Sequence, residues 1–203
     1  MHKKKSVPFK LIRIAQEKKI ALIYPSEHAL QNIKKIKKRT YEESLYGRLL
    51  VARIARIPKK DIELFLIESL TSFYSKKYNF YWSLSHKKQW ICATIDTKPI
   101  GIDIECLEKK NKRLFKTFTD QEWNILGKKT WRVFYTGWTA KEATLKIFSL
   151  PLERIHDVMI IARRKNSITL SYKKHISSVH ITMRQHIIVA VARQNIDNEI
   201  VHE

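Results

Sequence analysis

Helix-like and strand-like segments come in blocks along this chain, and the order of the blocks restricts the folds that it can adopt. One block of helical patterns ends near Phe73 and is followed by short strand-like segments; a second ends at Pro151 and is again followed by strand-like segments. This order is typical of α+β folds. We therefore predict two similar-sized α+β halves, residues 1–101 and 102–203. They should pack tightly, because no linker rich in Gly, Ser or Pro separates them.

Local signals define the clearest helices. Leu45 and Leu49 recur at helical spacing, and Pro58 ends that helix. Thr119 and Glu122 form a capping-box pattern at the start of another. The expected helices cover residues 26–38, 41–57, 62–73, 119–126 and 131–148, and the expected strands cover 9–14, 20–24, 80–84, 90–95, 100–104, 158–162, 168–172, 179–183 and 187–192.

The chain is strongly basic. It has 40 Lys and Arg against 19 acidic residues, a net charge of +21. Residues 1–60 alone hold 17 basic and 4 acidic side chains, or +13 (17 − 4). Such a charge attracts nucleic acid, phosphorylated cofactors, anionic membranes or acidic proteins, and charge alone does not choose among them. A surface decorated with lysine for no specific purpose is a further alternative.

Cysteine content and hydropathy indicate a cellular setting. Cys92 and Cys106 are the two cysteines, which is too few for a disulfide framework, and they lack metal-ligand spacing. The basic start of the chain is not followed by an apolar run of signal-peptide length. No stretch approaches the ~20 apolar residues of a membrane span. We therefore predict a soluble protein of the cytoplasm that does not bind membranes.

A pair of carboxylates marks the strand expected over 100–104. In Gly101-Ile102-Asp103-Ile104-Glu105, residues two apart point to the same face of a strand, so Asp103 and Glu105 lie side by side. A hard divalent cation such as Mg²⁺ explains two adjacent negative charges, since it prefers oxygen ligands and often shares them with phosphates. An exposed edge strand with two solvated acids is the simpler alternative for this pattern alone.

Two further patterns carry chemistry-bearing side chains. On the helix over 131–148, Glu142 and Lys146 are four residues apart and share a face, as an ordinary surface ion pair also would. Ser85 and His86 follow the strand expected over 80–84 and could hold a phosphate. A nucleophile with its base is not favoured there, because no G-x-S-x-G turn surrounds Ser85.

Taken together, these patterns resemble the 4′-phosphopantetheinyl transferase superfamily. Its two signatures are a G-[IV]-D-[IV]-E strand and a [WF]-x-x-K-E-[AS]-x-x-K helix, and both are complete in Gly101–Glu105 and Trp138–Lys146. The resemblance is close over residues 79–150. The chain length is similar to that of the larger, surfactin-synthetase-activating type. That type implies a monomer whose two related halves pack as a pseudo-two-fold pair around coenzyme A and a metal.

The resemblance implies an enzyme, a holo-[carrier-protein] synthase. It would transfer 4′-phosphopantetheine from coenzyme A to a serine of an acidic apo acyl or peptidyl carrier protein and release 3′,5′-adenosine bisphosphate. Asp103, Glu105 and Glu142 would bind Mg²⁺, with Mn²⁺ as an alternative. The implied catalytic residues are Glu142 and Lys146, where Glu142 or a metal-bound water that it orients is the base. The implied coenzyme A ligands are Ser85 and His86 at the 3′-phosphate, and Lys141 and Lys146 at the other phosphates.

Two departures from the family pattern affect the expected binding of coenzyme A. Glu43 stands where this type often has an arginine, and Lys38, Arg39 or Arg48 are candidate substitutes. A Gly-Lys-Pro element before Ser85 is missing, and Lys76 and Lys77 are the nearest basic residues there.

These departures motivate one alternative, a degenerate homologue that binds coenzyme A without turnover. A second alternative is a nucleic-acid-binding protein that uses the basic residues 1–60. It is disfavoured because that segment carries no helix-turn-helix, RNA-recognition or zinc-finger signature.

Overall fold

The computed structural model describes residues 9–13, 38–69, 72–88 and 90–195. The strand expected over 20–24 and nearly all of the helix expected over 26–38 lie outside these residues. The chain divides into two compact units, Met1–Thr97 and Lys98–Glu203. The exact halves 1–101 and 102–203, and their pseudo-two-fold packing, stay predictions.

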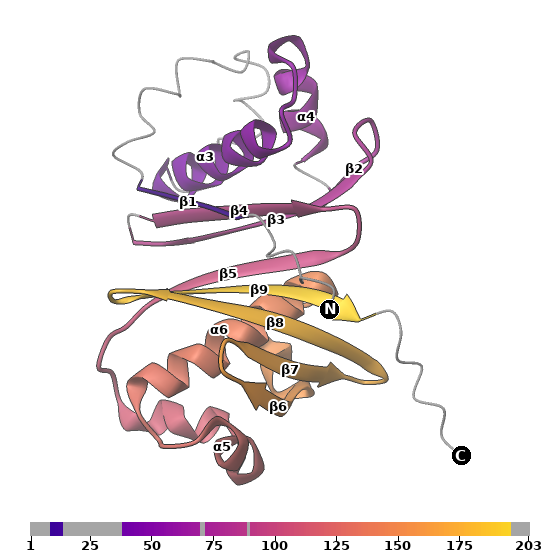
Figure 1. Cartoon of the computed structure of the whole chain (residues 1–203). Helices are drawn as coiled ribbons and strands as arrows, with labels where there is room; N and C mark the ends of the chain where they lie inside the picture. The colour runs from indigo at the N-terminus through magenta and orange to yellow at the C-terminus, as the bar shows by residue number, and fades with distance from the viewer. Residues whose placement is uncertain (1–8, 14–37, 70–71, 89, 196–203) are drawn as a thin grey trace. The chain divides into compact units, whose positions relative to one another are not determined.

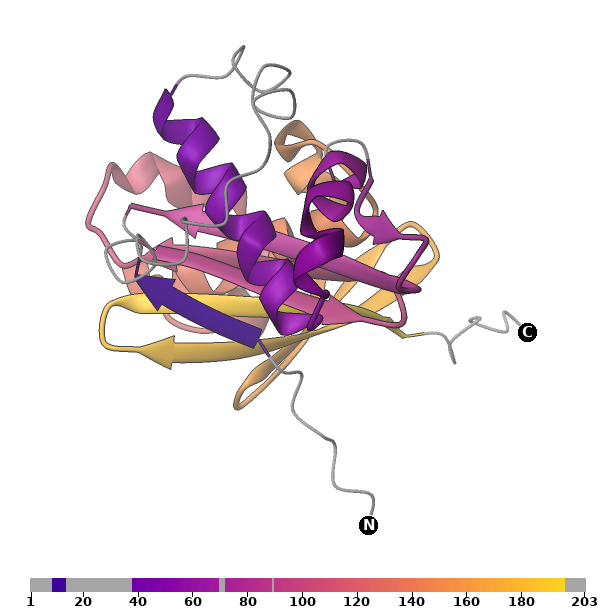
Figure 2. The same ribbon diagram turned by 90° about the horizontal axis from the view of Figure 1, so that it is seen from above.

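The first unit contains a four-stranded antiparallel sheet in the order β1-β4-β3-β2. Helix α3 lies across β3 and β4, as Figure 2 shows. The strands are β1 (Phe9–Arg13), β2 (Tyr74–Ser75), β3 (Phe80–Lys87) and β4 (Trp90–Asp96); the helices are α3 (Lys38–Ile54), α4 (Ile62–Glu68) and a 3₁₀ helix, Lys59–Asp61.

The core of this unit forms where the apolar faces of α3 and α4 meet the sheet. Val51 of α3, Phe65 of α4 and Trp82 of β3 are buried in one cluster, and the rings of Phe65 and Trp82 lie 6.2 Å apart, edge to face. Helix α4 ends at Glu68, before the predicted residue 73. The hydroxyl of Ser69 donates to the Leu66 carbonyl, a local bond that competes with continued helix.

The second unit contains a five-stranded antiparallel sheet in the order β5-β9-β8-β7-β6, drawn from pink to yellow in Figure 1. Its strands are β5 (Ile100–Cys106), β6 (Val158–Arg164), β7 (Ser167–Tyr172), β8 (His175–Arg184) and β9 (Ile187–Asn195); its helices are α5 (Asp120–Leu126), α6 (Trp131–Ile147) and the 3₁₀ helices Lys112–Thr117 and Leu152–Asp157. The predicted α+β class, with two antiparallel sheets and helices, is confirmed.

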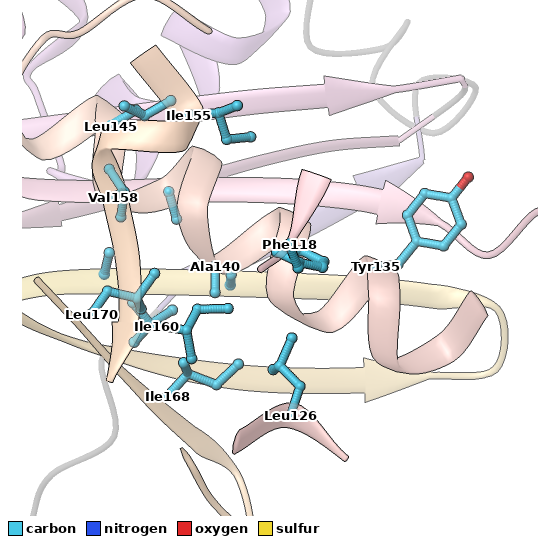
Figure 3. Packing of buried hydrophobic residues seen from close by; sticks show 14 of the residues in the cluster. Phe118, Leu126, Tyr135, Ala140, Leu145, Ile155, Val158, Ile160, Ile168 and Leu170 are labelled. Atoms are coloured by element: carbon cyan, nitrogen blue, oxygen red, sulfur yellow. The ribbon is translucent and has the colours of Figure 1, made fainter. Parts of the chain in front are cut away.

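Helix α6 packs across the sheet of the second unit and contacts all five strands, while α5 packs on the edge strand β6. The buried side chains between them come from both layers, as Figure 3 shows for Ala140 and Leu145 of α6 and for Ile160 and Leu170 of the sheet. Burial of this apolar area stabilises the unit and fixes α6 relative to β5. In the part of the chain that the structure describes, no helix is long and apolar enough to cross a membrane.

Candidate functional site

Strand β5 presents its carboxylates on the face that meets α6. Gly101 lies against α6, since a Cβ on it would fall 1.8 Å from the carbonyl oxygen of Ala143. Residues two apart share a face of a strand, so Asp103 and Glu105 also face this helix. Both are buried, with exposed fractions of 3% and 6%. The two carboxylates are therefore not the solvated acids of an exposed strand.

Glu142 on α6 completes a group of three carboxylates. The pKa of Glu142 is raised to about 9, first by burial and then by the negative charge of Asp103, a hydrogen bond with Asp103 and the charge of Glu105, while Lys146 opposes the rise. The hydrogen bond places Glu142 against Asp103, and Glu105 is near enough for its charge to act on Glu142. A carboxyl group with so high a pKa holds its proton near neutral pH.

Lys146 supplies the positive charge in this cluster. Its Nζ donates to Asp103 Oδ1 at 2.9 Å and to the carbonyl oxygen of Ile102 at 2.8 Å. The side chain remains 33% exposed. The ammonium group thus stands between the carboxylates and solvent. A phosphate that approaches the cluster could pair with it.

The donor chemistry of the cluster fits a hard divalent cation. Asp103, Glu105 and Glu142 offer carboxylate oxygens only, which are the ligands that Mg²⁺ prefers. A cation would offset the repulsion that raises the pKa of Glu142. Within the described ranges, no three His, Cys, Asp or Glu side chains already surround a common point as metal ligands would. The side chains of this cluster would have to close around an ion.

Lys141 is enclosed inside the protein, whereas the sequence motif suggests a lysine that is open to a phosphate. Its Nζ lies 2.7 Å from Glu122 Oε1, and both side chains are only 1% exposed. Burial lowers the pKa of Lys141, and the bond and charge of Glu122 oppose this effect. An ammonium group enclosed in this way is poorly placed to contact a phosphate. The assignment of Lys141 to coenzyme A stays a prediction, and this burial does not favour it.

Glu122 connects three elements around this buried pair. The predicted capping box is present, since Glu122 accepts from the Thr119 backbone N–H and Thr119 accepts in return. Its Oε1 also accepts from the backbone N–H of Ile160 on β6 at 3.0 Å. The capping pattern revealed the helix start. It did not reveal Lys141 as a partner, because that residue lies on another helix.

Ser85 and His86 belong to the first unit and lie within β3, which extends to Lys87, beyond the predicted end at residue 84. Ser85 pairs with Cys92 and His86 with Ile91 across the ladder to β4. Neighbouring residues of a strand point to opposite faces, so the two side chains leave β3 on opposite sides. Their assignment to coenzyme A stays a prediction.

Arg48, one candidate substitute for the missing arginine, has structural partners. Its Nε donates to the carbonyl oxygen of Ser69 at 3.3 Å, and its Nη1 donates to the carbonyl and hydroxyl oxygens of Ser44. These bonds connect α3 to the end of α4. The side chains of Lys38, Arg39 and Glu43 lie outside what the structure describes.

Comparison with known proteins finds one family that matches part of the second unit. Residues 99–195 match the family model of the 4′-phosphopantetheinyl transferase superfamily. A Bacillus subtilis protein named 4′-phosphopantetheinyl transferase is 33% identical over 94 residues, which cover 39% of this chain and 42% of that protein. The chain thus matches less than half of that relative's length. The segment 99–195 that matches the family model contains Asp103, Glu105, Glu142 and Lys146. Over residues 99–195, the chain is therefore similar to the 4′-phosphopantetheinyl transferase superfamily.

Proposed function

We propose that this protein transfers the 4′-phosphopantetheine group of coenzyme A to a serine of an apo carrier protein. One observation supports the proposal: Asp103 is bonded to Lys146 and to Glu142, and Glu105 acts electrostatically on Glu142, all inside the segment that matches the superfamily. The predicted setting is the cytoplasm, with a monomeric enzyme and an acidic acyl or peptidyl carrier protein as acceptor.

In this proposal Asp103, Glu105 and Glu142 hold Mg²⁺, with Mn²⁺ as an alternative. When bound, the ion supplies positive charge that neutralises the pyrophosphate of coenzyme A. Lys146 adds a second positive charge on the same side, because its ammonium group is bonded to Asp103 and still partly exposed. Ser85 and His86 remain the proposed contacts of the 3′-phosphate.

Glu142 is the proposed base. With a pKa of about 9 it carries a proton near neutral pH, and it accepts another group's proton only after losing its own. A cation that neutralised the neighbouring carboxylates would lower the pKa of Glu142, and Glu142 could then act as a base.

The serine Oγ then forms a bond to the phosphorus that bears the pantetheine arm, and the serine proton passes to Glu142. The pyrophosphate P–O bond breaks, and its electrons leave with 3′,5′-adenosine bisphosphate.

Mass spectrometry of an apo carrier protein tests the proposal. After incubation with coenzyme A, Mg²⁺ and this protein, the carrier should gain the mass of one phosphopantetheine group. Asp103→Ala and Glu142→Gln should abolish the gain. Glu153→Gln should not, since Glu153 is an exposed acid on a 3₁₀ helix of the same unit.

Two outcomes would replace the proposal. Binding of coenzyme A without any gain of mass, over several carriers, would support the degenerate homologue. Tight binding of nucleic acid with no affinity for coenzyme A would support the nucleic-acid-binding alternative.

A further inference from the structure

The second unit contains a cavity of about 420 Å³ that is separate from the carboxylate cluster. It lies where the start of α6 meets the β6–β7 turn and the second half of β8. Arg132, in the first turn of α6, is one of its lining residues. Arg132 and Glu142 are ten positions apart on this helix, which is about 15 Å along the axis. The cavity is therefore separate from the proposed metal site and from the residues that form it.

The charge of this cavity has a single sign. Four of its lining residues are cations, and among the lining residues that the structure describes none is acidic. The cations are Arg132, Arg163, Arg164 and Lys165. All four are exposed residues, so their charges are available to a ligand. The N-terminal end of the 17-residue helix α6 adds positive potential at the same place.

Part of the wall is apolar and part carries hydroxyl groups. Val133, Ile168 and Ile181 contribute apolar surface, and Ser167 and Thr182 contribute hydroxyls. Arg163 is held in place, because its Nη1 donates to the carbonyl oxygen of Leu126. A cavity with several cations, one of them anchored, with hydroxyl groups and an apolar wall can hold a compact ligand with one anionic end and one less polar end.

We propose that this cavity is a binding site for a phosphorylated small molecule. The guanidinium groups of Arg132 and Arg164 would contact the phosphate, since the planar fork of arginine matches phosphate oxygens. The apolar wall would take the rest of the molecule. An acidic segment of a protein partner fits less well, because a cavity within the usual range of about 300–1,000 Å³ encloses a compact ligand rather than an extended surface.

The probe is phenyl phosphate, which joins a phosphate to an apolar ring. The ¹⁵N-labelled full-length protein, kept metal-free with a chelator, is titrated by NMR. Amide shifts should concentrate in residues 163–168 and 180–183, and inorganic phosphate should bind more weakly at the same place. The mapping separates this site from the carboxylate cluster, so the result does not depend on the proposed transferase activity.

A charge-matched pair of variants tests the assignment. Arg132→Gln with Arg164→Gln should raise the dissociation constant about tenfold, equivalent to about 1.4 kcal/mol. Lys173→Gln with Lys174→Gln removes the same charge from the β7–β8 turn of the same sheet and should change it by less than about twofold. Arg163 is kept because of its bond to Leu126. Circular dichroism and thermal unfolding confirm that both variants fold.

Three results would overturn the proposal. One is equal weakening by both double variants, which would indicate non-specific attraction by net charge. Another is the absence of amide shifts in the cavity residues. The third is tight binding of an oligoglutamate peptide at these residues without binding of phenyl phosphate, which would make the cavity a contact for an acidic protein.

Discussion

Gly101 of β5 and Ala143 of α6 approach so closely that a side chain on the glycine would overlap the helix backbone. An added Cβ would lie 1.8 Å from the Ala143 carbonyl oxygen and 2.9 Å from its carbonyl carbon. Backbone atoms of a buried helix cannot move aside as a flexible side chain can. The contact therefore sets the distance between strand and helix, and with it the distance between Asp103 and Glu142.

Gly101→Ala should disrupt the site by separating α6 from β5. Overpacking usually costs about 1–3 kcal/mol, and the backbone clash places this variant at about 3 kcal/mol or more. Transfer activity should be lost even where the protein still folds. Urea unfolding and the carrier-mass assay measure the two effects.

Gly47→Ala is the matched control for this substitution. There an added Cβ would meet the end of the flexible Leu84 side chain at 2.9 Å, and alanine improves helix propensity by about 1 kcal/mol. The free energy of unfolding of the Gly47→Ala variant should therefore change little. A similar loss in both variants would contradict the assigned role of the Gly101 contact.

The buried pair of Lys141 and Glu122 should respond unequally to loss of either partner. Glu122→Ala leaves Lys141 buried without its counter-charge and should cost about 3–5 kcal/mol. Lys141→Met should cost less, because Glu122 still accepts from the backbone N–H groups of Thr119 and Ile160. Urea unfolding of the two variants and of the double variant gives both costs and their coupling.

Lys129→Met provides the comparison with an exposed ion pair. Lys129 Nζ and Asp120 Oδ1 lie 3.2 Å apart, and the two side chains are 55% and 94% exposed. The free energy of unfolding should therefore fall by less than about 1 kcal/mol. Should Lys141→Met leave stability unchanged and instead weaken coenzyme A binding tenfold, the predicted contact of Lys141 with coenzyme A would be supported.

The stability of the metal-free protein should depend on pH through Glu142. Its pKa is raised from an ordinary 4.5 to about 9, so between these values the unfolded chain binds fewer protons than the folded one. Stability therefore falls as pH rises through this window. Thermal unfolding in chelator should show this fall, and added Mg²⁺ should stabilise the protein more at pH 8 than at pH 5.

Glu142→Gln removes the titrating group and should reduce the slope of stability against pH in chelator. Glu153→Gln should keep it, since that exposed side chain lies on a separate 3₁₀ helix. An unchanged slope in Glu142→Gln would show that other groups cause the pH dependence.

Patterns within single elements predicted most of the described fold. The capping box of Thr119 and Glu122 gave the start of α5, and helical periodicity gave α6. Strand β2 was missed, because the two residues Tyr74 and Ser75 are too few to show an alternating pattern.

The sequence predicted the chemical types in the site better than their surroundings. The D-x-E pattern indicated that Asp103 and Glu105 share a face, and the strand geometry agrees. Lys141 precedes Glu142 directly, yet adjacent helix positions differ by about 100° in direction, so one faces Glu122 and the other Asp103. Only the three-dimensional packing of α5, α6 and β6 reveals this difference.

The net charge of +21 should speed the encounter with an acidic carrier protein. Attraction between opposite charges raises association rates, by about tenfold or more in strong cases, and salt screens it. With transfer to an acidic carrier as the assay, kcat/KM should fall several-fold between about 20 mM and about 300 mM salt, as the screening length shortens. Saturating carrier removes the dependence on encounter, so kcat should change little and serves as the internal control. A kcat/KM that stays constant over this range would show that the basic surface has no part in carrier recruitment.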